Sequence, residues 1–185
     1  SEIRRFRINV PKAPVMQTVK NITINETEIA RITVNASDSN PEDMLTYSLN
    51  NTRFNKTAEN IFEWQTGYND VGIYYVLVSV SDGIFTLNPT VKITVLNKNR
   101  APILTGNIPD LNWSEDTSKE INLSDYFSDP DGDSLIYSVY QKSADITASF
   151  NNTISTLSSG KDFFGNAWII FKASDSSSYN LSNNA

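Results

Sequence analysis

Short runs of alternating hydrophobic and polar residues recur along the chain, with turn-forming residues between them. Examples are ARITV (30–34), LTYSL (45–49), YYVLVSV (74–80), TVKITV (90–95), LIYSVY (135–140) and AWIIFKA (167–173). None of these runs keeps the 3.6-residue period of an amphipathic helix for long. Period-two alternation at this spacing predicts an all-β fold built from β-sandwiches.

The second half of the chain repeats the pattern of the first. SDSNPEDMLTYSL (37–49) matches SDPDGDSLIYSV (128–139), and GIYYVLVSVSDG (72–83) matches GNAWIIFKASDS (165–176). An acidic turn precedes each pair, NETE at 25–28 and SEDT at 114–117. Internal repetition of this kind predicts tandem domains. We expect one sandwich over residues 15–96, a linker over 97–102 and a second sandwich over 103–185.

The two copies differ at their ends. Residues 90–96 predict the closing strand of the first sandwich, whereas the second copy reaches SSSYNLSNNA just after the strand pattern AWIIFKAS. We therefore expect the second sandwich to lack its closing strand. The opening segment, residues 1–14, has the pattern of such a strand and linker. Its apolar residues correspond to those of 90–96: Phe6 to Val91, Ile8 to Ile93 and Val10 to Val95.

Three explanations of this arrangement stay open. The sequence is one piece of a longer repeat protein, its closing strand lies beyond the given residues, or the opening strand of one subunit completes the second domain of the next. The third builds a head-to-tail polymer of identical subunits. Residues 1–14 carry a net charge of +3 in a chain of net charge -6, which favours docking on an acidic neighbour. The expected donor strand comprises Ile3, Arg4, Arg5, Phe6, Arg7, Ile8, Asn9 and Val10.

Composition excludes several classes of function. A sequence pI of about 4.6 argues against nucleic-acid binding, which needs a basic surface. The chain has no Cys and no His, so disulfides, His-based catalytic triads and the commonest zinc ligand are excluded. No run of about 18 apolar residues is present, so no membrane span is expected. An enzyme would have to rely on carboxylates alone, and we expect none.

The matching segments resemble tandem cadherin-like and immunoglobulin-like repeats of microbial surface proteins. The resemblance is carried by SDPDGDSLIYSV, IFEWQTGYNDVGIYYVLVSVSDG (61–83) and VLNKNRAPIL (95–104), which together cover most of both domains. DVGIY (70–74) is similar to the tyrosine corner of such sandwiches, with Tyr74 fixing the loop before its strand. The resemblance implies the fold, but such modules serve adhesion, spacing and surface-layer functions alike.

The resemblance also implies calcium at the junction between the two domains. Loops at that junction would supply oxygen ligands, which suit calcium. Domain one departs from the pattern, because DSNPED (38–43) replaces DPDGD and leaves Asp38, Asp43 and Asp82. Lys98 and Arg100 in the linker are the alternative, since either could pair with the carboxylates and replace the ion. The expected calcium ligands are Glu26, Glu28, Asp70, Asn97, Asn99, Asp129, Asp131, Asp133 and Asp175.

The Asn-X-Ser/Thr pattern of N-glycosylation occurs nine times, about twice the number that composition predicts by chance. This excess favours a glycan-covered extracellular surface. A secreted chain without Cys fits an archaeal or bacterial cell surface better than an animal one. The candidate glycosylation sites are Asn21, Asn25, Asn35, Asn50, Asn55, Asn112, Asn122, Asn151 and Asn180.

These patterns favour a secreted, N-glycosylated subunit of an extracellular filament, assembled by donation of the strand at 3–10 into the second domain of a neighbour. Its partners would be identical subunits, with a cell surface or glycan as a further target. The alternative is a calcium-rigidified adhesive or carbohydrate-binding module within a long surface protein. Trp64 and Trp168 lie in strand patterns, so under either function we expect them to pack in the fold.

Overall fold

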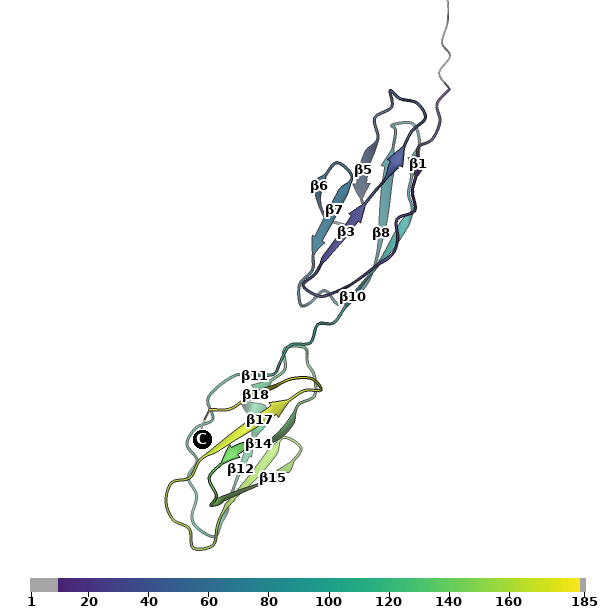
Figure 1. Cartoon of the computed structure of the whole chain (residues 1–185). Coiled ribbons are helices and arrows are strands. Elements are labelled where there is room, and N and C mark those ends of the chain that lie inside the picture. The colour runs from purple at the N-terminus through teal and green to yellow at the C-terminus, as the bar shows by residue number, and fades with distance from the viewer. Residues whose placement is uncertain (1–9, 184–185) are drawn as a thin grey trace, which may run out of the picture. The chain divides into compact units, whose positions relative to one another are not determined.

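The computed structural model describes residues 10–183, which form two compact all-β units (Figure 1). The chain divides into unit 1, Ser1–Lys98, and unit 2, Asn99–Ala185, and this division falls inside the predicted linker. The fold class expected from the sequence is confirmed. Residues 3–9 of the expected donor strand lie outside the described residues. Its last residue, Val10, is 64% exposed and precedes the first strand of unit 1.

Unit 1 is a β-sandwich. One sheet has the order β2-β10-β8-β5 with β9 also paired to β8, the facing sheet has the order β3-β7-β6, and β1 pairs with β4. Strand β10 runs parallel to β2 and antiparallel to β8, so it lies between them. The strands of residues 10–98 are β1 (Val15–Met16), β2 (Ile22–Asn25), β3 (Ile29–Thr33), β4 (Ala36–Ser37), β5 (Thr46–Leu49), β6 (Asn55–Ala58), β7 (Ile61–Gln65), β8 (Gly72–Ser81), β9 (Thr86–Leu87) and β10 (Thr90–Leu96).

The core of unit 1 follows from the period-two alternation. In β10 every second side chain is buried, namely Val91, Ile93 and Val95. Trp64 is only 4% exposed and packs edge-to-face against Tyr74, with 4.9 Å between ring centroids. The Tyr74 hydroxyl donates a 2.9 Å hydrogen bond to the carbonyl oxygen of Asp70, as expected of a tyrosine corner. This bond fixes the loop that leads into β8.

Unit 2 contains related sheets with fewer strands. One sheet has the order β12-β16-β15, another has the order β14-β17-β18, and β11 pairs with β13. The elements of residues 99–183 are β11 (Ile103–Leu104), β12 (Ser118–Asn122), the 3-10 helix Leu123–Asp125, β13 (Phe127–Ser128), β14 (Ile136–Lys142), β15 (Ile146–Asn151), β16 (Ile154–Ser159), β17 (Ile169–Ser174) and β18 (Tyr179–Leu181).

Strand β18 follows the strand pattern AWIIFKAS and was not expected from the sequence. It pairs with the end of β17, with Asn180 opposite Ala173, as Leu87 of β9 lies opposite Val80 of β8. Strand β18 is therefore the counterpart of β9, the short strand that precedes β10 in unit 1. No strand of residues 99–183 corresponds to β10 itself, because β17 pairs only with β14 and β18.

Candidate functional site

Unit 2 has a groove where unit 1 has β10. The two strands that enclose β10 in unit 1 have counterparts on either side of this groove: residues 110–113 for β2 and residues 165–169 for part of β8. The first correspondence follows from the acidic turns. Each has a hydrogen bond from its fourth to its first residue and a positive φ at its third, 67° at Thr27 and 58° at Asp116. The groove therefore occupies the position of a closing strand.

The groove is large and partly hydrophobic. Its volume is about 740 Å³, and the buried side chains of Ile146, Leu157 and Ile169 line it. Leu111 and Trp113 lie on one side, and Phe164, which is 87% exposed, lies on the other. A groove lined in part by hydrophobic side chains, beside a strand edge that has no partner strand among residues 99–183, is the arrangement that an added β-strand would fill.

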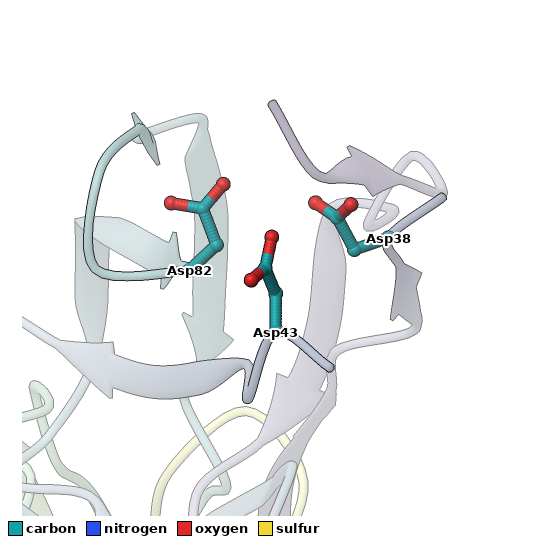
Figure 2. A group of neighbouring side chains, drawn as sticks. All are labelled: Asp38, Asp43 and Asp82. Carbon is teal, nitrogen blue, oxygen red and sulfur yellow. The ribbon is translucent and has the colours of Figure 1, made fainter. Parts of the chain in front are cut away.

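A second candidate site is a carboxylate cluster in unit 1, formed by Asp38, Asp43 and Asp82 (Figure 2). Asp38 and Asp43 lie in the loop between β4 and β5, and Asp82 directly follows β8, so two loops bring the carboxylates together. One oxygen of each lies within 4.8 Å of the others. Asp43 lies between the other two side chains in Figure 2. In the sequence, these three residues stand out only where domain one departs from the DPDGD pattern.

The carboxylates of this cluster are held by the backbone on one side and unpartnered on the other. Asp38 Oδ1 accepts the backbone N–H of Asn40 at 2.7 Å, and Asp82 Oδ1 accepts those of Phe85 and Ile84 at 2.6 and 2.8 Å. The Phe85 hydrogen bond is the main reason that the pKa of Asp82 lies below its usual value. The Oδ2 atoms of Asp38 and Asp82 are buried without a hydrogen-bond partner. Three converging carboxylates with two unsatisfied oxygens suit a hard cation such as calcium.

The predicted calcium ligands of unit 1 are engaged by the protein itself. The fully buried carboxylate of Glu26 accepts the backbone N–H groups of Val71 and Lys98, both at 3.1 Å. The Glu28 carboxylate accepts the backbone N–H of Asn25 at 2.9 Å, and this bond lowers the pKa of Glu28. Asp70, a third predicted ligand, forms an ion pair with Arg53 at 2.6 Å. Asn97, the fourth, is exposed.

In unit 2, two linker residues bind the predicted ligands. Arg100 donates to Asp131 from its backbone N–H at 2.6 Å and from Nε at 2.8 Å. The Asn99 amide donates to Asp175 at 3.0 Å. Pairing of Arg100 with these carboxylates was one of the alternatives open from the sequence, and the structure contains that pair.

The other acidic residues of this loop have different environments. One oxygen of Asp129 accepts the backbone N–H of Asp131 at 2.8 Å, while its Oδ2 is buried without a hydrogen-bond partner. Asp133 is exposed. Calcium at the nine predicted residues stays a prediction. In unit 2 it would have to compete with the Arg100–Asp131 pair and to replace the hydrogen bond from Asn99 to Asp175.

These contacts make the stability of unit 2 dependent on pH. The Arg100 guanidinium lowers the pKa of Asp131, and hydrogen bonds from Ser178 and Asn99 lower that of Asp175. A carboxyl whose pKa is lower in the folded state stabilises the fold above its unfolded pKa, about 3.9, and loses that contribution as pH falls through the folded value.

We expect the melting temperature of unit 2 to decrease as the pH is lowered below about 4. Scanning calorimetry between pH 7 and pH 2 measures this decrease, with Asp131→Asn and Asp175→Asn as variants that reduce it. A transition of unit 2 that stays constant over this range would contradict the assignment.

The nine glycosylation candidates differ in accessibility. Asn122 and Asn180 are half-buried, and the other seven are exposed. The Asn180 amide donates to the carbonyl oxygen of Pro102 at 3.0 Å, and its own side-chain oxygen accepts the backbone N–H of Leu181. Asn180 is therefore already used to hold β18 against the start of unit 2.

Comparison with known proteins supports the domain type. Residues 99–183 match the family model described as Bacterial Ig domain. Human protocadherin-24 EC1-2 is similar in structure, with a TM-score of 0.58 at 16% identity, and 95% of each chain is covered. Protocadherin gamma B2 extracellular cadherin domains 3-6 match with a TM-score of 0.58 at 17% identity, over 93% of this chain and 45% of that one. No curated protein matches the chain in sequence.

These comparisons support an Ig/cadherin-like fold for the chain. Domains of this kind are usually extracellular, and this fold is typically non-enzymatic. An endo-fucoidan hydrolase of glycoside hydrolase family 107 also matches, but with a TM-score of 0.38, and the chain spans only 27% of its length. That similarity carries no argument about catalysis. Among residues 10–183, no helix is long and apolar enough to cross a membrane.

Proposed function

We propose that this protein is the structural subunit of a secreted, N-glycosylated extracellular filament. In this proposal, residues 3–10 of one subunit add as a β-strand to the groove of unit 2 in the next. Its function is mechanical: extension, attachment or contact between cells. The observation that carries the proposal is the open groove at the position that β10 fills in unit 1.

Hydrophobic burial supports this interaction. Phe6, Ile8 and Val10 have the same alternation as the buried residues of β10. Burying each of them would contribute roughly 1.5–3 kcal/mol. Backbone hydrogen bonds to residues 165–169 on one side and to residues 110–113 on the other would add to this, as in other cases of strand addition.

Charge supports the same partner. Arg4, Arg5, Arg7 and Lys12 make residues 1–14 basic, whereas the rest of the chain is acidic. Asp110 and Glu115 are among the residues that line the groove. Opposite charges accelerate docking more than they strengthen the bound state, and salt screens them. Assembly of separate subunits should therefore be slower at high salt.

A graft of the strand tests this proposal directly. Moving residues 1–10 behind Ala185 through a Gly-rich linker should give a soluble monomer, because each subunit would then fill its own groove. Sedimentation of the graft and of the original chain at equal concentration measures this. A graft that still polymerises would mean that the strand or the groove has another partner.

We also propose that Asp38, Asp43 and Asp82 hold one calcium ion in unit 1. The two buried, unpartnered oxygens and the convergence of three carboxylates support this. Calcium bound only by the folded state would raise the melting temperature of unit 1. Asp82→Asn should remove the response to calcium, whereas Glu59→Gln, at an exposed carboxylate of the same unit, should leave it intact. Equal melting temperatures in millimolar calcium and in EDTA would contradict this site.

A second function remains a candidate because of this cluster. A calcium-binding Ig/cadherin-like unit also suits an adhesive or carbohydrate-binding module within a long surface protein. The two functions share the fold but differ in covalent structure. In the filament, each subunit is a separate chain held by strand donation, whereas in the long protein the repeats are joined by peptide bonds.

A further inference from the structure

The groove of unit 2 differs from the matching region of unit 1 in its side chains as well as in its strands. In unit 1, Trp64 of β7 lies opposite Ala30 of β3, and in unit 2, Leu157 of β16 lies opposite Lys119 of β12. The pairing of β3 with β7 and of β12 with β16 is otherwise the same, so Leu157 is the counterpart of Trp64. By the match of 72–83 with 165–176, Ala167 is the counterpart of Tyr74.

These two exchanges remove the aromatic pair from the region where the closing strand packs. Trp64 and Tyr74 contact each other in unit 1, with ring centroids 4.9 Å apart. Their counterparts Leu157 and Ala167 both line the groove of unit 2. Trp113, the counterpart of Ile24, also lines the groove, as do Phe163, Phe164 and Trp168. A strand with the side chains of β10 would meet Leu157 and Ala167 where β10 meets Trp64 and Tyr74 in unit 1, which leaves room for a larger side chain at this point.

The opening strand has a larger side chain than β10 next to the position where unit 2 has a smaller one. Val91 lies opposite Val76 and Ile93 opposite Tyr74 in unit 1. In the same register, Phe6 would lie opposite Ile169 and Ile8 opposite Ala167. Phe6 is then the diagonal neighbour of Ala167, at a separation that aromatic side chains can span. The opening strand thus has Phe6 where β10 has Val91. This position is next to Ala167, which is the counterpart of Tyr74.

We propose that the groove of unit 2 is matched to residues 3–10 of a second copy of this chain, in the register of β10, with Phe6 anchored in the space beside Leu157 and Ala167. This inference rests on the proposed strand exchange and adds the register and the residues that determine specificity. A strand with the side chains of β10 would place Val at this position instead of an aromatic residue.

The test compares three variants of the full chain with the original and with a control. Phe6→Val introduces the β10 residue, Ala167→Tyr restores the ring of unit 1, and the third variant combines both. Asn9→Ser, at a polar position of the same strand, is the matched control. The readout is the rate at which assembled filaments dissociate in guanidinium chloride, since changes at one interface act mainly on dissociation.

We expect Phe6→Val and Ala167→Tyr each to dissociate about tenfold faster or more, as a core truncation and an overpacked core would. The double variant should dissociate at a rate closer to that of the original chain than the two single effects combined would predict, because both positions border the same space. Asn9→Ser should be unchanged. Phe6→Val leaves the groove untouched, so it keeps the test decisive if Ala167→Tyr impairs folding of unit 2.

Two different failures can be told apart by adding Ile8→Pro, which removes a strand hydrogen bond in the middle of the donor segment. If Ile8→Pro prevents assembly but Phe6→Val dissociates like the original, strand exchange stands and the Phe6 anchor is wrong. If Ile8→Pro assembles normally, or if the original chain does not assemble, both the strand exchange and the anchor are overturned.

Discussion

Deletion of residues 1–10 is expected to abolish filament assembly while both units remain folded. Without this segment, the groove of unit 2 has no strand to bind, so subunits cannot join head to tail. Among the described residues, 10–183, Val10 is 64% exposed and the core clusters of the two units include no residue before Met16, so we expect the deletion to spare both folds. Electron microscopy detects the loss of filaments, and calorimetry checks that the unfolding transitions are retained.

A matched control keeps the deletion interpretable. Replacing Arg4, Arg5 and Arg7 with Gln should slow assembly at low salt and still allow it, because these residues contribute charge rather than the buried face of the strand. Filaments that form normally without residues 1–10 would rule out this segment as the donor.

Trp64→Ala is expected to cause the largest loss of stability in unit 1. Trp64 is buried between Phe54 and Tyr74, with ring centroids at 5.8 and 4.9 Å, and the Arg53 guanidinium lies 5.1 Å from its ring. Truncating a buried Trp to Ala typically costs about 3–5 kcal/mol. For a domain of this size, the melting temperature should fall by more than about 10 °C.

Scanning calorimetry measures this loss, provided that the two units unfold in separate transitions. Tyr75→Ala is the control in the same unit, because Tyr75 is 67% exposed and should change stability by about 0.5 kcal/mol or less. The transition of unit 2 should not move in either variant. A decrease of less than about 1 kcal/mol for Trp64→Ala would contradict the packing described for this core.

The sequence predicted the strands well where alternation was regular. Val91, Ile93 and Val95 were expected to form one buried face, and they do. Strand β18 was missed because Tyr179–Leu181 is short and polar, and its pairing depends on the tertiary position of β17. The local sequence pattern carries little information about such a strand, because pairing with a neighbouring strand, and not its own composition, makes the segment a strand.

The candidate sites were harder to predict than the fold. Asp82 lies far from Asp38 and Asp43 in the sequence, and only the folded unit shows that the three carboxylates converge while two of their oxygens stay unpartnered. The burial of Glu26 was equally invisible, because its carboxylate accepts two backbone N–H groups from distant segments. Arg100 could be identified as a competitor for Asp131 from sequence, but not its three contacts with that carboxylate and the neighbouring carbonyl.

The central claim is that separate chains are joined by donated strands, and denaturing gels of the native filament test it most directly. Unheated and boiled samples of the same material should be compared. The account predicts a ladder of oligomers in the unheated sample that collapses on boiling to one band near 20.7 kDa plus the mass of its glycans. A boiled band far above that mass would contradict it, because the units would then be repeats of one longer chain.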